Sequence, residues 1–133
     1  MRAIPVFMYH HINRHADDLV TLTPEDFENH LWVLKGRGFR TLFLDEQVQI
    51  IQGEGLSFPP SVALTFDDGH LDNWVYAFPL LKKYHMKATI FLITSWVGEG
   101  EERPQWNPGH QGNLPEILRH REVKKEPAQE IFP

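Results

Sequence analysis

Two adjacent carboxylates are the residues of this sequence best suited to chemistry. The segment Thr65-Phe66-Asp67-Asp68-Gly69-His70 places Asp67 and Asp68 at the end of an apolar run, directly before a glycine that permits a turn. If both side chains are turned toward one cavity, one carboxylate can hold a cation and the other can accept a proton, which is what metal-assisted hydrolysis needs. The alternative is turn chemistry alone, because Asp and Gly dominate turns.

Other uses of acids at a strand end fit this segment poorly. A phosphotransferase with an aspartyl nucleophile would want two acids separated by one residue, whereas Asp67 and Asp68 are adjacent. A calcium-binding loop would want acids at alternate positions and a closing glutamate, and Asp72 and Asn73 do not follow that spacing. Hydrolysis and turn formation therefore remain as the two interpretations.

Strand and helix patterns alternate around this segment, which predicts an α/β sheet or barrel with parallel strands. The expected strands are residues 4–9, 39–44, 61–66 and 87–93, and the expected helices are residues 24–36, 45–51 and 72–84. Thr23 and Pro24 give the first helix a cap and a first-turn proline, and Asp45 is the expected cap of the second. Pro79 predicts a late start or a kink in the third helix.

The first strand, residues 4–9, is a continuous apolar run of the kind that a sheet covered on both faces requires. His10 follows it directly, so His10 is expected at the same rim as Asp67 and Asp68 if the strands are parallel. There His10 would contact substrate or the bound water, and the alternative is a hydrogen-bonded histidine at a strand end. Ligands bind at this rim because loops at the carboxyl ends of strands project functional groups over a rigid base.

Taken together, residues 3–98 resemble the polysaccharide deacetylase family, which is the NodB-homology domain or carbohydrate esterase family four. The resemblance rests on the segments Met8–Ile12, Leu64–Gly69, Phe78–Tyr84 and Lys87–Leu92. It implies the N-terminal part of a distorted (β/α) barrel, a divalent metal that is most commonly zinc, and removal of acetyl groups from an N-acetylated sugar or polysaccharide. It also implies that Asp67 is the general base that activates water, that Asp68 is a metal ligand, and that His10 belongs to the substrate site.

One expected part of the metal site is missing from the pattern. The family supplies two further ligands from a His-Ser/Thr-x-x-His motif, and nothing after residue 70 matches it. His11 and His15 have a helical spacing but lie upstream, and their surroundings predict solvated loop histidines. We therefore expect a truncated or decayed deacetylase with an incomplete zinc site and little or no activity, or alternatively a non-catalytic carbohydrate-binding remnant or defective fragment.

The composition argues against several other classes of protein. The 133 residues carry a formal charge of −5, with no basic run that would bind nucleic acid, and no cysteine for thiolate chemistry. No apolar stretch is long enough to span a membrane or to form a signal peptide, which predicts a cytoplasmic protein as written, or an extracytoplasmic one if a leader was removed. Residues 1–98 form the expected partial barrel domain, and residues 99–133 a polar, proline-rich tail that is either disordered or a truncated continuation.

Overall fold

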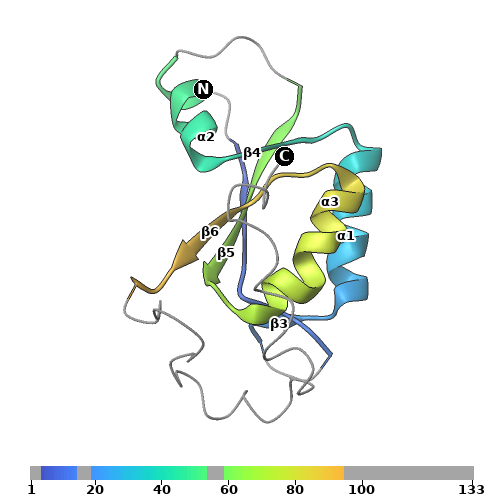
Figure 1. The fold of residues 1–133 in the computed structure, drawn as a ribbon. Helices are drawn as coiled ribbons and strands as arrows, with labels where there is room; N and C mark the ends of the chain where they lie inside the picture. Colours follow the sequence, from blue (N-terminus) through green and yellow to red (C-terminus); the bar gives the residue numbers. More distant parts are fainter. Residues whose placement is uncertain (1–3, 15–18, 54–58, 95–133) are drawn as a thin grey trace.

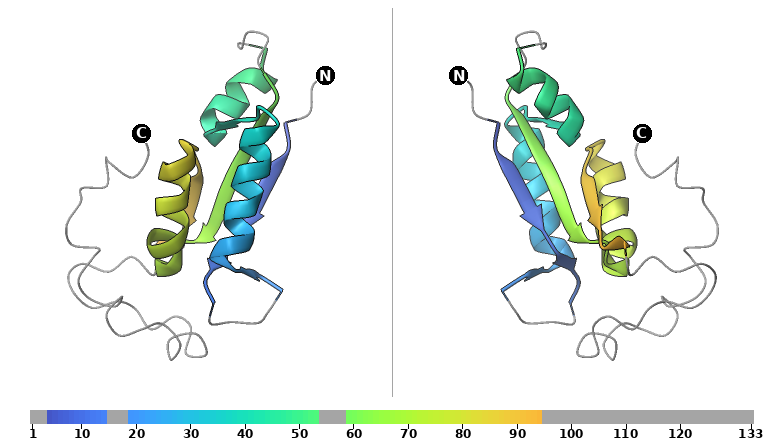
Figure 2. Two further views of the ribbon diagram at one scale, coloured as in Figure 1. Left: turned by 90° about the vertical axis from the view of Figure 1, so that its right-hand side faces the viewer. Right: turned by 90° about the vertical axis from the view of Figure 1, so that its left-hand side faces the viewer.

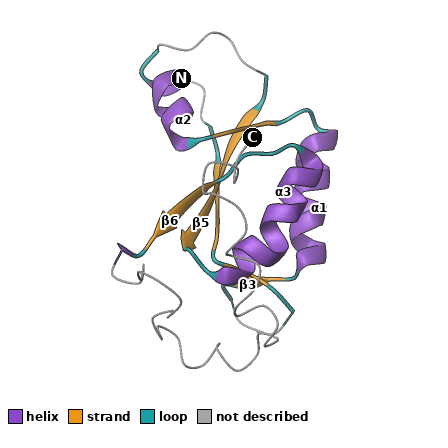
Figure 3. Ribbon diagram, in the orientation of Figure 1, coloured by secondary structure: helices purple, strands orange, loops and turns teal. Residues whose placement is uncertain are grey.

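The computed structural model describes residues 4–14, 19–53 and 59–94. The predicted tail at 99–133 and His15 lie outside the described residues. Within them, the elements in chain order are β1 (Val6–Tyr9), β2 (His11–Ile12), β3 (Thr21–Leu22), α1 (Pro24–Gly36), β4 (Arg40–Leu42), α2 (Leu44–Ile51), β5 (Ser61–Asp68), the π-helical segment η1 (Asn73–Ala77), α3 (Phe78–Tyr84) and β6 (Thr89–Leu92) (Figure 3). The predicted α/β alternation is confirmed.

β5 is the centre of the main sheet, and all of its neighbours run parallel to it (Figure 1). β1 pairs along one side of β5, from Val6 opposite Ala63 to Tyr9 opposite Phe66. On the other side, β4 pairs with the first part of β5 and β6 pairs with its last part. The carboxyl ends of β1, β5 and β6 therefore meet at one edge of the sheet.

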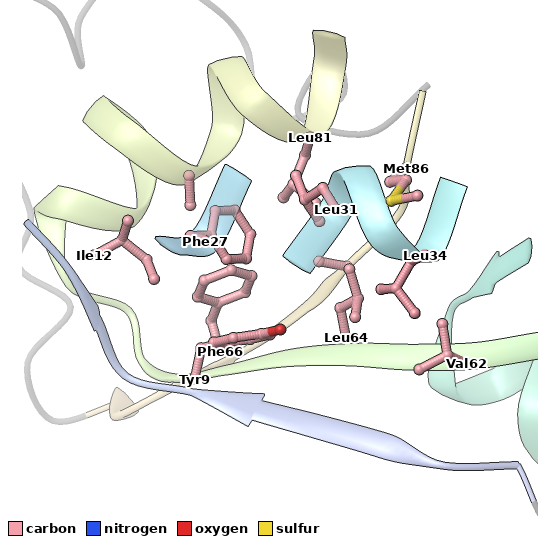
Figure 4. Packing of buried hydrophobic residues seen from close by; sticks show 12 residues of the cluster. Tyr9, Ile12, Phe27, Leu31, Leu34, Val62, Leu64, Phe66, Leu81 and Met86 are labelled. Atoms are coloured by element: carbon pink, nitrogen blue, oxygen red, sulfur yellow. The ribbon is translucent and has the colours of Figure 1, made fainter. Parts of the chain in front are cut away.

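The hydrophobic core lies between the sheet and the helices α1 and α3, which lie side by side against one face of the sheet (Figure 2). The fully buried Phe27 of α1 packs its ring against the rings of Tyr9 and Phe66, with ring centroids 5.1 and 5.6 Å away (Figure 4). Val62, Leu64 and Phe66 of β5 belong to this core. Because side chains alternate along a strand, Asp67 starts on the opposite face from Phe66.

β1 is more exposed than its apolar sequence predicts. The side chains of Val6, Phe7 and Met8 are 46, 40 and 63% exposed, so the prediction of a strand covered on both faces is wrong for the described structure. Among the described strands β1 pairs with β5 alone, and its other edge borders a cavity of about 780 Å³ between β1, β3 and α1. An apolar run can thus mark an edge strand as well as a central one.

The boundary between β4 and α2 also differs from the expected one. The strand predicted over residues 39–44 is shortened to Arg40–Leu42, and the helix begins at Leu44. Phe43, and not Asp45, is the N-cap residue, and the carboxylate of Glu46 accepts a hydrogen bond from the Phe43 backbone N–H at 2.8 Å. Glu46 satisfies one of the backbone donors that a helix start leaves free, so the expected Asp45 cap is not needed.

Pro79 lies in the first turn of α3, directly after η1. The helix does not start late, because the chain is helical from Leu71 to Tyr84, and the irregularity next to Pro79 is the wider π-helical turn of η1. Proline has no backbone N–H to donate, and the first turn of an α-helix does not use those donors. The helix that begins near the end of β5 can therefore continue toward Tyr84 as α3.

Tyr9 links the sheet to α1, and its ionisation makes the free energy of unfolding depend on pH. Burial raises the pKa of Tyr9 from 10.0 to about 12, while its hydroxyl lies 3.2 Å from His30 Nδ1. Above pH 10.0 the unfolded chain loses this proton and the folded chain keeps it, so stability is lost as the pH rises toward 12. We expect Tyr9→Phe to flatten this alkaline fall in urea unfolding measured between about pH 9 and about pH 11. An unchanged fall would contradict the assignment.

Candidate functional site

His10 and Asp67 face each other at the carboxyl edge of the sheet. His10 follows β1, Asp67 is the second-last residue of β5, and the parallel pairing of these strands brings the two side chains together. His10 Nε2 is 3.7 Å from Asp67 Oδ2, and the side chains are 26 and 32% exposed. The carboxylate is therefore held near an imidazole while it still reaches solvent.

Asp68 turns away from the regular strand geometry. Its φ of 73° and the φ of 72° at Gly69 lie in the left-handed region, which aspartate and glycine tolerate better than other residues. This change of direction ends the alternation of side chains and brings Asp68 Oδ2 to 3.4 Å from His70 Nε2. Each of the two adjacent carboxylates thus has its own histidine neighbour, and each is about one-third exposed.

Gly69 is required by its backbone conformation more than by lack of space. A Cβ atom there would lie 2.4 Å from Leu92 Cδ2, but this is the end of a flexible side chain that is 59% exposed and can move. Its φ of 72° remains costly for any L residue. We expect Gly69→Ala to lower the free energy of unfolding by about 1–2 kcal/mol in urea titrations.

The matched control for this prediction is Gly36→Ala. Gly36 ends α1, and nothing lies within 4 Å of an added Cβ. Alanine is the better helix former, so this variant should be as stable as the wild type or slightly more stable. Equal losses in both variants would contradict a special role for the backbone at Gly69.

A buried polar network lies behind this rim. Asp72 is 2% exposed, and its Oδ2 accepts hydrogen bonds from His11 Nδ1 at 2.8 Å and from Asn13 Nδ2 at 2.7 Å. Asn73 Nδ2 donates to Asp72 Oδ1 at 3.1 Å and to the backbone oxygen of His10 at 2.8 Å. The loops after β1 and β5 are therefore joined through one carboxylate.

His70 and His11 stack within this network. Their ring centroids are 3.6 Å apart, with an angle of 23° between the ring planes. Burial, and then the nearby His11, lower the pKa of His70 from 6.5 to about 4. His70 is consequently neutral at pH 7, which is the form of imidazole that ligates metal ions.

The sequence placed His10, Asp67 and Asp68 at one rim, and the structure has all three there. It did not anticipate the partners Asp72, Asn13 and Asn73, and its interpretation of His11 as a solvated loop histidine is wrong. His11 lies in β2, is 6% exposed and is bonded to Asp72. The signal that could have indicated this network is the polar pair Asp72 and Asn73, which follows closely after the end of β5.

Two of the described side chains at the rim are of types that can ligate a metal ion. Over residues 4–14, 19–53 and 59–94, no group of three or more His, Cys, Asp or Glu side chains is arranged to hold a metal ion. Asp68 and the neutral His70 supply one carboxylate and one imidazole, both suitable donors for zinc, but a catalytic zinc usually takes three protein ligands. The two donor types therefore fit a zinc ion, but the described residues do not supply the third ligand.

Solved structures that share this fold include a deacetylase. A Streptococcus pyogenes deacetylase, PplD, solved in complex with acetate, matches with a TM-score of 0.64 and 33% identity over 68% of this chain and 42% of its own. IcaB from Ammonifex degensii matches with a TM-score of 0.65 and 28% identity over 71% of this chain and 40% of its own. The fold is therefore part of a deacetylase-type (β/α) barrel.

The chain belongs to the polysaccharide deacetylase family, because the family model for polysaccharide deacetylases matches residues 57–126. The YxkH protein of Bacillus subtilis (strain 168) is 37% identical over 95 residues, which cover 71% of this chain and 33% of that protein. The poly-beta-1,6-N-acetyl-D-glucosamine N-deacetylase of Staphylococcus epidermidis is 40% identical over 81 residues, which cover 59% of this chain and 27% of the enzyme. The chain thus spans a third or less of the length of these relatives.

The described helices contain no span long and apolar enough to cross a lipid bilayer.

Proposed function

We propose that this chain carries the catalytic-base half of a metal-dependent deacetylase that hydrolyses the N-acetyl amide of an N-acetylated sugar or polysaccharide. The observation that carries the proposal is the pair Asp67 and Asp68 at the end of the central strand, with His10 and His70 beside them. Membership of the polysaccharide deacetylase family supports the substrate class, as does the relative named a poly-beta-1,6-N-acetyl-D-glucosamine N-deacetylase.

Asp67 is the general base in this proposal. Its carboxylate is one-third exposed, so it can accept the proton of a water molecule that attacks the acetyl carbonyl carbon. His10, 3.7 Å away on the same rim, orients this carboxylate and contacts the bound sugar. The products are acetate and the free amine of the sugar.

Asp68 and His70 are the proposed metal-binding side chains. A bound divalent cation, most readily zinc, would polarise the amide carbonyl and make water more acidic. Asp68 Oδ2 and His70 Nε2 lie 3.4 Å apart, which is close enough for one ion to contact both the oxygen and the nitrogen. Because the described ligand set stops at these two, we expect weak metal binding and impaired activity.

A second candidate is a carbohydrate-binding remnant without catalysis, which the incomplete ligand set favours. The two functions are separated by incubating the 133-residue chain with N-acetylglucosamine oligomers, zinc, and a chelator in parallel. Slow acetate release that stops on chelation supports the deacetylase. Oligomer binding that ignores the chelator, with no acetate released, supports the remnant and contradicts the deacetylase.

A further inference from the structure

Asp72 is the most buried charged side chain of the site region and is not part of the catalytic assignment above. It is 2% exposed, and its two oxygens accept hydrogen bonds from three side chains, those of His11, Asn13 and Asn73. Burying a carboxylate is costly unless donors compensate it, so removing its charge or its partners must rearrange this network. We infer that Asp72 is the positioning residue that holds the histidines of the rim against Asp67 and Asp68; this rests on the proposed function.

The first connection runs through Asn73 to His10. Asn73 Nδ2 bonds both to Asp72 Oδ1 and to the backbone oxygen of His10, at 3.1 and 2.8 Å. The backbone that carries the His10 ring is therefore tied to Asp72. Because that ring lies 3.7 Å from Asp67 Oδ2, a shift of this backbone changes the distance between His10 and Asp67.

The second connection runs through His11 to His70. An ionised carboxylate only accepts hydrogen bonds, so the Asp72 contact requires the proton on His11 Nδ1 and fixes the plane of the ring. This ring stacks on His70 at 3.6 Å, and His70 Nε2 lies 3.4 Å from Asp68 Oδ2. Asp72 thereby acts on His70 indirectly, because it fixes the His11 ring on which His70 stacks.

Asp72→Asn tests this inference with almost no change in side-chain volume. Oδ2 takes two donors and Oδ1 takes one, whereas an asparagine has one accepting oxygen and one donating NH₂ group. Either orientation of the amide sets a donor against a donor. If the amide nitrogen takes the Oδ2 place, the His11 proton leaves Nδ1 or its bond breaks, and if the nitrogen takes the Oδ1 place, the bond from Asn73 is lost. Because the first change acts on His70 and the second on His10, we expect the ring signals of at least one of these two histidines to move.

The measurement is the long-range ¹H–¹⁵N NMR correlation of the histidine rings in the full 133-residue chain, which reports the tautomer of each imidazole. Asp45→Asn is the matched control, because Asp45 is exposed in the first turn of α2, and α2 lies at the opposite end of the sheet from the carboxyl ends of β5 and β6 (Figure 1). The control should leave all three rings unchanged. The inference is overturned if the Asp72→Asn chain folds and the His11 tautomer and the ring signals of His10 and His70 are all unchanged.

Zinc titration gives the functional consequence. We expect Asp72→Asn to weaken zinc binding by about 10- to 100-fold, and Asp45→Asn to leave it unchanged. If the wild-type chain binds no zinc, the proposed metal site fails, while the NMR result still decides the role of Asp72. If Asp68→Asn abolishes zinc binding but Asp72→Asn changes nothing, the positioning role alone is wrong.

His11→Gln covers the case in which Asp72→Asn does not fold. Glutamine retains a donor for Asp72 but removes the ring that stacks on His70. We expect the His70 ring signals to shift and zinc affinity to fall in this variant as well. A folded His11→Gln chain with unchanged His70 signals and unchanged zinc affinity would overturn the inference.

Discussion

Asp67→Asn is expected to lower acetate release from N-acetylglucosamine oligomers by about 10²- to 10⁴-fold, the usual contribution of a general base. The amide keeps the size and the place of the carboxylate at the end of β5, but it cannot accept a proton from water. The wild-type rate is itself expected to be low, because the described ligand set is incomplete. Acetate should therefore be followed with a coupled assay over long incubations.

Two comparisons make this result specific to Asp67. Asp45→Asn removes an exposed carboxylate on α2 and should leave the rate unchanged. Zinc affinity should be retained in Asp67→Asn, because Asp67 is proposed to move a proton and not to bind the ion. Acetate release that persists at the wild-type rate in Asp67→Asn would refute the role of this residue.

Phe27→Ala should lower the free energy of unfolding by about 3–5 kcal/mol, as expected for removal of a fully buried aromatic ring. Phe27 is 0% exposed and contacts Tyr9 and Phe66, so its removal opens a cavity between α1 and the two strands that carry the rim (Figure 4). Urea unfolding followed by circular dichroism measures the loss.

Trp32→Ala is the matched control on the same helix. Trp32 is 63% exposed, so loss of its larger side chain should change the free energy of unfolding by only about 0.5 kcal/mol. Equal losses in Phe27→Ala and Trp32→Ala would show that the core does not lie between α1 and the sheet.

The elements that could be predicted from sequence are those with strong local signals. Thr23 and Pro24 mark the start of α1, and the Thr23 hydroxyl accepts a hydrogen bond from the Asp26 N–H as a cap should. The boundary of β4 could not be predicted, because the apolar residues 42–44 run across it and no residue type separates the strand from α2. The exposure of β1 could not be predicted either, because the same apolar sequence pattern occurs in strands at the edge and in the centre of a sheet.

In the candidate site, too, the residues with a local sequence signal could be predicted and those joined by long-range contacts could not. Asp67 and Asp68 are adjacent in sequence and follow a buried strand, so their place at the rim follows from a local pattern. The bond between His11 and Asp72 joins residues 61 positions apart and exists only because β1 pairs with β5. Single-sequence patterns do not carry such contacts, which is why His11 was interpreted as a loop residue.

Zinc titration of the purified chain by calorimetry tests the central claim most directly. We expect weak, saturable binding by the wild type, loss of binding in Asp68→Asn, and retention of binding in Asp67→Asn and Asp45→Asn. This pattern would assign the ion to Asp68 and leave Asp67 free to act as the base. Wild-type affinity in Asp68→Asn, or no binding by the wild-type chain, would contradict the account.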